Sequence, residues 1–223
     1  METYQQHFDI SCELRNKFWE AAGEVDSDVI AHMINPAFMG GPMWPSVRQA
    51  FITVRQPDRT ILASDGLSDP YSNMESVDAN AAYNGLGLEV YTAVEPVTVP
   101  VQQTWQFQLL YQAAQLMADA GNVVTLLNDM TWITTEFYDV DVPADFRNSE
   151  GRVGAILGLK DDTIPDTVTL SLEEVKIVNV KLLTLSELEY VALNGADGRI
   201  KLAGLLQQQK NATLSTLTRP SLV

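Results

Sequence analysis

The sequence predicts an α+β fold: a single domain in which a mixed, mostly antiparallel sheet is packed with helices. Three observations predict it. The chain of 223 residues is 46% hydrophobic, which is enough apolar material for one packed core. Strand-like and helix-like segments follow one another without the strict alternation that a parallel α/β sheet requires. No internal repeat and no Ser-, Gly- or Pro-rich linker divides residues 1–223, so one domain is expected.

The N-terminal part predicts a helix, a loop and a hairpin. Apolar side chains recur every four residues in 9–22, which is typical of an amphipathic helix. The apolar stripe comprises Ile10, Leu14, Phe18 and Ala22. Residues 29–45 are irregular and rich in Met, Gly and Pro, which predicts a loop with apolar anchors. Residues 46–55 and 60–64 predict a hairpin, because a Pro-Asp turn connects them.

A long polar loop between two strand-like runs is the most distinctive stretch of the chain. Residues 61–63 and 86–94 have the apolar patterns of strands, and the connection at about 69–85 is rich in Asp, Asn, Gly and Ser. Connections of this length are uncommon unless they bind something or are disordered. The glycine pair at Gly85 and Gly87 indicates a bulge or a close approach of two backbone segments.

The second half of the chain predicts further helices and strands in turn. Helices are expected at 103–120, from the capping box Thr184–Glu187 through Ala192, and at 199–209, with turns at Asn194-Gly195 and Asp197-Gly198. Strands are expected at 123–127, 132–135, 153–159, 167–172, 174–183 and 212–218. The polar, acidic residues 136–152 are expected to form an exposed loop.

The charge and the hydropathy pattern exclude several classes of function. The net charge is −15, which repels nucleic acid and anionic membranes, so neither is expected as a partner. No apolar run approaches the roughly 18–20 residues that span a bilayer, and the N-terminal residues show no secretory signal. The acidic excess serves either solubility or the electrostatic steering of a basic partner. Cys12 is the only cysteine, which agrees with a reducing, cytoplasmic location.

No pattern indicates catalytic, cofactor-binding or metal-binding residues. His7 and His32 are the only histidines, and no metal-ligand spacing includes them. The Gly66–Pro70 segment lacks the last glycine of a nucleophile elbow, and no histidine follows it to complete a triad. Gly85-Leu86-Gly87 lacks the third glycine of a dinucleotide fingerprint. We therefore expect a protein that is not an enzyme.

Two aromatic residues stand in segments rich in turn residues. Trp44 and Tyr71 are each surrounded by Gly, Pro, Ser or Asp. Aromatic residues in exposed loops are enriched at the hot spots of protein interfaces, although they also anchor loops to a core. Contact with a partner and loop anchoring therefore remain open for both residues.

An ordered series of short blocks resembles one known family. The blocks are Gly66-Leu67-Ser68-Asp69 with Tyr71, Gly85-Leu86-Gly87-Leu88-Glu89-Val90, the Trp-containing helix at 105–120, Asn148-Ser149-Glu150 with Arg152 and residues 153–159, Asp161-Asp162, and the closing run from Val175 through 185–189 to 199–209. In this order, over about residues 45–218, they resemble the suppressor of fused family.

The resemblance implies a suppressor-of-fused-like fold and a non-enzymatic interaction domain. Animal members of the family bind and restrain zinc-finger transcription factors, and grip a partner peptide between this domain and a C-terminal domain that has no counterpart here. Short bacterial-type members consist of this domain alone, and many are regarded as immunity proteins that neutralise toxins. In the animal members, the tyrosine of the first block and an acid in the next loop contact the partner. These correspond to Tyr71 and Asp78.

The leading hypothesis from the sequence is therefore an immunity protein that binds a protein toxin, plausibly a basic one. Asp69, Glu75 and Asp78 would form an acidic rim around Tyr71, with Trp44 as a second aromatic contact. A strand at the sheet edge, near 86–94, would offer a further site for a peptide. Two alternatives remain open: a regulator that sequesters an endogenous protein, and a hydrolase without a familiar motif.

Overall fold

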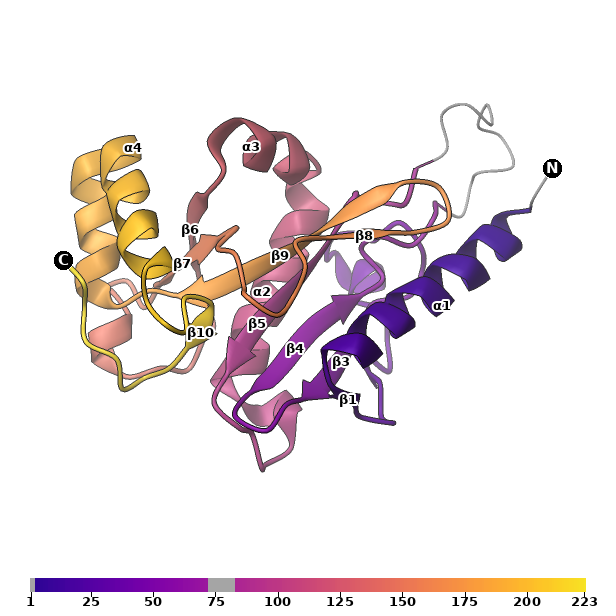
Figure 1. Cartoon of the computed structure of the whole chain (residues 1–223), viewed down its shortest axis with the longest axis horizontal. Coiled ribbons are helices and arrows are strands. Elements are labelled where there is room, and N and C mark those ends of the chain that lie inside the picture. Colours follow the sequence, from indigo (N-terminus) through magenta and orange to yellow (C-terminus); the bar gives the residue numbers. More distant parts are fainter. Residues whose placement is uncertain (1–2, 72–82) are drawn as a thin grey trace.

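A mixed sheet forms the centre of the computed structural model, which describes residues 3–71 and 83–223 (Figure 1). Within these residues the sheet has ten strands, and its main path runs β1-β3-β4-β5-β9-β7-β6, with β2 beside β3, β10 beside β5 and β8 beside β9. The strands are β1 (Glu24–Val25), β2 (Ile30–Ala31), β3 (Ala50–Arg55), β4 (Thr60–Asp65), β5 (Leu88–Val94), β6 (Ile133–Phe137), β7 (Val153–Leu157), β8 (Thr167–Thr169), β9 (Glu174–Leu182) and β10 (Leu214–Ser215).

The helices lie on both faces of this sheet. They are α1 (Tyr4–Ala22), α2 (Trp105–Ala120), α3 (Val123–Met130) and α4 (Leu185–Gln207), with short 3₁₀ turns at η1 (Pro36–Met39), η4 (Val101–Gln103) and η5 (Ala144–Phe146). Among the paired strands of the described chain, β5–β9 and β10–β5 are parallel and the other pairs are antiparallel. The predicted α+β class, with a mixed and mostly antiparallel sheet in one domain, is confirmed.

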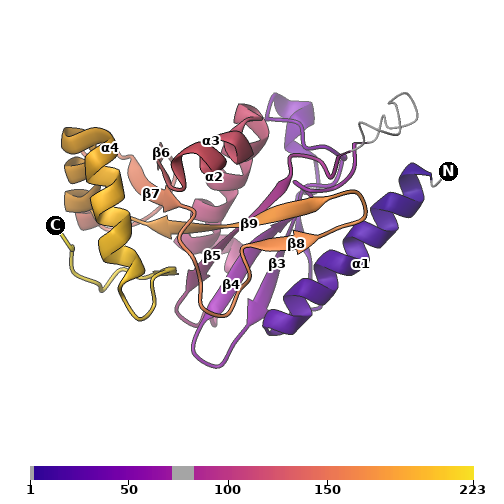
Figure 2. The ribbon, with the colours of Figure 1, turned by 45° about the horizontal axis from the view of Figure 1, so that its top comes forward.

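Strands β3 to β5 are buried on both faces because successive side chains point to opposite sides. On one side, Phe51 and Leu62 pack with α2 in the largest apolar cluster. On the other, Ile52 and Ile61 pack against Trp19 of α1. Figures 1 and 2 show α1 in front of these strands and α2 behind them. A third cluster packs α4 onto the far end of the sheet, around β7.

Helix α1 begins at Tyr4, earlier than the predicted 9–22 segment, because Thr3 and Gln6 form a capping box ahead of it. Its buried face also differs from the predicted stripe. Ser11, Arg15 and Trp19 are the buried residues, whereas Ile10 is exposed. The helix therefore presents two polar side chains to the protein interior, which an apolar pattern cannot indicate.

The prediction of a strand at 123–127 was wrong, because this segment is helix α3. Val123 and Leu127 are one helical turn apart and both are buried against the main cluster. A short apolar run is compatible with a buried strand or with one helical face, and here the packing on α2 and the sheet decides for helix.

The expectation of an edge strand near 86–94 was also wrong. Strand β5 lies in the middle of the sheet, between β4 and β9, and β10 also pairs with its end. Its backbone groups are engaged on both sides, so β5 has no free edge to which a partner peptide could be added.

Helix α4 joins the two helices that the sequence predicts near its ends. Gly195 lies inside it with φ 57° and ψ −133°, which breaks the helical path at the predicted Asn194-Gly195 turn. Residues 197 and 198 are helical, so no second turn forms there. Of the helices in 3–71 and 83–223, none combines the length and the apolar content that crossing a membrane requires.

Candidate protein-binding site

The two ends of the long polar loop meet at one end of strands β4 and β5. Leu86 donates its backbone N–H to the carbonyl of Leu67 at 2.8 Å. Gly85 lies beside them with φ +57°, and a Cβ on it would stand 2.4 Å from that same carbonyl oxygen. Only glycine fits this position, so the close backbone approach predicted from the glycine pair is present.

A buried carboxylate, Glu89 of β5, organises the turn that follows β4. Glu89 Oε1 accepts the backbone N–H groups of Gly66 and Ser68 at 3.0 and 2.9 Å, and the Ser68 hydroxyl at 2.6 Å. Its other oxygen accepts the hydroxyl of Ser64. Since a fully buried carboxylate is costly unless it is hydrogen-bonded, these four donors explain how Glu89 can lie inside the sheet.

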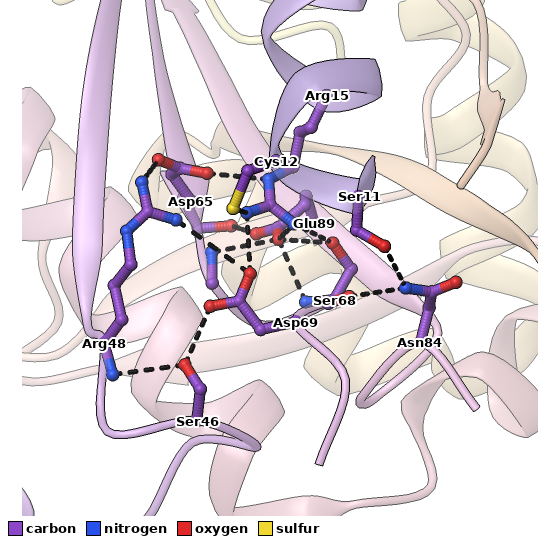
Figure 3. A network of polar contacts seen from close by, with 12 residues as sticks. Ser11, Cys12, Arg15, Ser46, Arg48, Asp65, Ser68, Asp69, Asn84 and Glu89 are labelled. Carbon is purple, nitrogen blue, oxygen red and sulfur yellow. Dashed lines mark hydrogen bonds and ion pairs between the residues drawn. The ribbon is translucent and has the colours of Figure 1, made fainter. Parts of the chain in front are cut away.

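Arg15 of α1 reaches into this turn and contacts two more carboxylates (Figure 3). Its Nε donates to Asp65 Oδ1 at 2.6 Å and its Nη2 to Asp69 Oδ1 at 2.7 Å. Its Nη1 donates to the Ser68 hydroxyl at 2.9 Å and lies 3.6 Å from Glu89 Oε1. The planar guanidinium thus joins the N-terminal helix to the turn through all three of its nitrogen atoms.

A second cation comes from the segment just before β3. Arg48 forms an ion pair with Asp65 and lies 3.9 Å from Asp69. Ser46, from the same segment, donates its hydroxyl to Asp69 Oδ2 at 2.7 Å. Figure 3 shows these groups, with Arg15 and Glu89, converging from α1, from the segment before β3, from β4 and its following turn, and from β5. We call Arg15, Arg48, Asp65, Asp69 and Glu89 the buried charge network.

Within this network, Arg15, Arg48 and Asp65 hold one another ionised. Burial raises the pKa of Asp65, but the charges of Arg15 and Arg48 lower it by a larger amount, so the net shift of the pKa is downward. Burial lowers the pKa of Arg15, and the carboxylates of Asp65, Glu89 and Asp69 more than reverse this, so its pKa is raised. Both groups are therefore charged at neutral pH.

Asn84 fixes the other end of the loop to α1 and to the β8–β9 turn. Its side-chain amide donates to Ser11 Oγ at 2.8 Å and accepts the backbone N–H of Leu172 at 2.9 Å. Its own backbone N–H donates to Glu173 Oε1 at 2.9 Å. Residues 66–70 and 84 are buried, and they are held by α1, by the segment before β3, by β5 and by the β8–β9 turn.

Tyr71 is the first exposed residue after this rigid turn. Its predecessor Pro70 is buried, whereas Tyr71 exposes 38% of its surface. Partial burial raises the pKa of the Tyr71 phenol, so the side chain is neutral at physiological pH. The structure thus presents a neutral aromatic side chain at the end of a turn that hydrogen bonds hold in place.

The other residues predicted for the site lie in different surroundings. Asp69 has no exposed surface and belongs to the buried charge network, so it does not form an acidic rim. Trp44 is also buried, with its ring edge-to-face on Phe51 at 5.7 Å, which makes it an anchor of its loop. Glu75 and Asp78 lie outside the described residues. Among the predicted site residues that the structure describes, Tyr71 is the one whose side chain is accessible to a partner.

The sequence did not predict the residues of the buried charge network that hold the turn before Tyr71. Two of them nevertheless stand out in the sequence as polar residues at positions expected to be buried. Glu89 is a charged residue inside the apolar run of β5, where an acid needs buried partners. Arg15 is spaced one turn from both Ser11 and Trp19, which marks a face of α1 that is not uniformly apolar.

The described residues offer little for chemistry. No group of three His, Cys, Asp or Glu side chains among them is placed to hold a metal ion. Cys12 lies beside the network, 3.7 Å from Arg15 Nη2, and burial raises the pKa of its thiol. A protonated thiol is a weak nucleophile, so this cysteine gives no support to a covalent mechanism.

The order of the strands and the helices on both faces define the class of fold. No protein-family model matches the sequence, and no curated protein is significantly similar to it. A chain from a crystal structure of the Sufu–Fu complex superposes with a TM-score of 0.57 at 13% identity, over 96% of this chain and 91% of that one.

The fold is therefore that of Suppressor of Fused, as the sequence blocks predicted. The crystal structure of Drosophila Suppressor of Fused is also similar, with a TM-score of 0.48 and 12% identity over 77% of this chain. This chain spans 42% of the length of that Drosophila chain.

Proposed function

We propose that the chain is a protein-binding domain without enzymatic activity, and that it acts in the cytoplasm as an immunity protein that neutralises a protein toxin. The observation that carries the proposal is Tyr71, exposed at the end of a turn that the buried charge network holds in place. Aromatic anchors on rigid supports are the usual hot spots of protein interfaces. A fixed base also lowers the entropy that binding costs.

The charge of the chain supports a basic partner. A net charge of −15 attracts a cationic protein from a distance and raises its association rate, with an effect that salt weakens. A toxin that acts on nucleic acid is such a protein, because it needs positive charge to hold phosphates.

A second candidate function is the sequestration of an endogenous protein. The Sufu–Fu crystal structure, which has the same fold, is a complex with another protein. The same Tyr71 surface would serve either role, so the identity of the partner decides between them. A hydrolase has less support, because the described residues include no cluster of His, Cys, Asp or Glu that could hold a catalytic metal ion.

The experiment is affinity purification of the tagged chain at low and at moderate salt, from its own cells and from mixed culture with competing cells, followed by mass spectrometry. We expect a basic toxin-like protein whose recovery falls as salt rises. A resident regulatory protein in its place would support sequestration. Failure to recover any partner from either culture at low salt would contradict the proposal.

The site is tested on the recovered partner by calorimetry with two single variants. Tyr71→Ala is expected to weaken affinity about 30-fold, which corresponds to the roughly 2 kcal/mol of a hot spot. Tyr138→Ala removes another exposed tyrosine, beyond β6, and is expected to change affinity less than about twofold. Unchanged affinity in Tyr71→Ala would exclude this surface.

A further inference from the structure

A loop between β2 and β3 exposes an unusual number of large apolar side chains. Each of them exposes between 63% and 104% of its reference surface. They are Met33, Ile34, Phe38, Met39, Met43 and Val47. We call residues 33–47 the apolar loop. Exposed apolar residues scattered singly need no explanation, but six in one short segment indicate an interaction surface.

Hydrogen bonds close the apolar loop on itself. The side chain of Asn35 donates to the carbonyl of Val47, and accepts the backbone N–H of Ala37 at 2.9 Å. Gly41 donates its backbone N–H to the carbonyl of Pro36 at 2.9 Å. The segment is thus a compact loop with joined ends, a type that frequently carries function.

Aromatic and amide contacts fix the apolar loop to the body of the protein. Trp44 is buried in the main apolar cluster. His32, just before the loop, packs edge-to-face on Tyr111 of α2 at 5.2 Å. Gln49, just after it, donates to the Pro42 carbonyl at 3.0 Å and accepts from Gln115 of α2 at 3.2 Å. Because the loop is held at both ends and in the middle, its apolar side chains are presented outward by the fold.

The chemistry of the loop points to an adaptable apolar contact on a strongly negative chain. Three of the six side chains are methionines, which are flexible and polarisable and suit surfaces that fit varied partners. Residues 24–47 contain no Lys or Arg, and Asp28, five residues before Met33 in the sequence, is exposed. Arg48, which follows the loop directly in the sequence, forms an ion pair with Asp65.

We propose that the apolar loop binds an amphipathic helix of a basic partner protein. The apolar face of the helix would cover the methionines and Phe38, and its Lys and Arg side chains would be attracted by the net negative charge of the chain. The proposal deepens the proposed protein-binding function by naming a second surface and the class of partner segment. Its own test needs no toxin.

A helix is favoured over an extended peptide because of what the loop offers. An extended peptide binds by adding to a row of free strand backbone groups, whereas η1 and its flanking turns are irregular and present side chains. A helix satisfies its own backbone internally and needs only such side-chain contacts. Charge disfavours two other occupants, because a second copy and an anionic membrane are both negative.

The probe is a synthetic 14-residue helix of Leu and Lys with the leucines on one face, compared with a peptide of the same composition scrambled to remove that face. Fluorescence anisotropy measures the affinity of both labelled peptides. We expect the wild-type chain to bind the amphipathic peptide at least tenfold more tightly than the scrambled one. Equal binding of the two would overturn the proposal, because charge alone would then account for the affinity.

Two double variants test whether the preference for the amphipathic peptide comes from the apolar loop. Phe38→Ser with Met39→Ser is expected to lose the tenfold preference, while Leu193→Ser with Ile200→Ser, on exposed positions of α4, keeps it. Retention of the preference in the first variant would overturn the proposal. If that variant does not give the wild-type circular dichroism spectrum, the fully exposed Met33→Ser takes its place.

Further measurements distinguish a bound helix from other occupants of the apolar loop, and distinguish this proposal from the proposed function. Sedimentation that shows a wild-type dimer dissociated by the Phe38→Ser and Met39→Ser variant would overturn the helix proposal in favour of a second copy. Loss of binding to phosphatidylcholine vesicles in that variant would overturn it in favour of lipid. Tyr71→Ala is expected to bind the peptide normally, so loss of partner affinity in Tyr71→Ala tests the proposed function independently.

Discussion

The buried charge network and the apolar loop differ in a way that reverses the usual distribution of residues. The network places three carboxylates and two guanidinium groups largely inside the protein, whereas the loop places six apolar side chains outside it. The two regions are close in sequence, since Arg48 of the network follows directly on Val47 of the loop.

The difference teaches that satisfied interactions, more than polarity, decide where a side chain lies. Arg15 donates to three oxygen acceptors within the chain, and Glu89 accepts from four donors, so both can be buried. Phe38 lies on a loop whose backbone bonds and Trp44 anchor keep it outside the core. We therefore expect changes in the network to affect folding, and changes in the apolar loop to affect binding.

The largest expected effect is that of Arg15→Met. Removing the cation leaves Asp65 and Asp69 buried beside each other with Arg48 as the remaining charge partner, and breaking a buried pair in this way costs about 3–5 kcal/mol. Urea unfolding followed by circular dichroism measures the loss. Lys17→Met, which removes an exposed ion pair on the same helix, is the control and should cost far less, because solvent screens that pair. A loss below about 1 kcal/mol for Arg15→Met would contradict the role given to the network.

A smaller effect is expected at Lys181, a buried cation with less compensation than Arg15. Burial, and then the charge of Arg219, lower the pKa of Lys181 to about 7, and Glu187 opposes them. Between pH 7 and pH 9 the unfolded chain holds a proton that the native chain has released, so stability rises with pH in this window. The rise attributable to Lys181 is roughly 2 kcal/mol, from about 1.4 kcal/mol per pH unit.

Urea unfolding at pH 7, 8 and 9 measures this dependence, and Lys181→Met is expected to abolish it. The same variant should also be more stable than the wild-type chain at pH 6, where the buried ammonium is charged. Identical pH slopes for the variant and the wild-type chain would show that Lys181 titrates as an exposed lysine does.

The smallest effect on folding is expected in the apolar loop. Phe38→Ser with Met39→Ser is predicted to change the free energy of unfolding by less than about 0.5 kcal/mol per site, because surface substitutions outside packed features fall in that range. Thermal unfolding at pH 7 checks this. A destabilisation above about 2 kcal/mol would mean that these side chains pack on the body of the protein and that the comparison with the network fails.

The sequence predicted much of the fold because local signals mark most of its elements. The capping box at Thr184 and the turn at residues 56–59 each depend on neighbouring residues, and each is present. The apolar run at 174–183 is strand β9 as predicted, although the second part of the strand is buried on both faces. Helix α3 was missed because a short apolar run has no local feature that separates a helical face from a strand.

The candidate site was less predictable, because its groups come from distant segments. Arg15 meets Asp65 and Asp69 only after α1 packs across β4, and no local pattern relates these positions. Asp69 was consequently expected at the surface, as most acids are. Tyr71 was identified through the resemblance and its turn-rich surroundings, and its exposure is a local property of the residue after the turn.

The central place of β5 has a consequence for the order in which the chain folds during synthesis. Leu88 pairs in parallel with Lys176, so one side of β5 stays unpaired until β9 has been synthesised. At 5–20 residues per second, this interval of about 90 residues takes roughly 5–20 s. Throughout it, β5 is the unpaired border of a partly made sheet, and its apolar side chains make the nascent chain prone to aggregation. Strand β5, which the sequence suggested as an edge, is thus a sheet edge only while the chain is being synthesised. A chaperone would bind this temporary edge on the ribosome-bound chain.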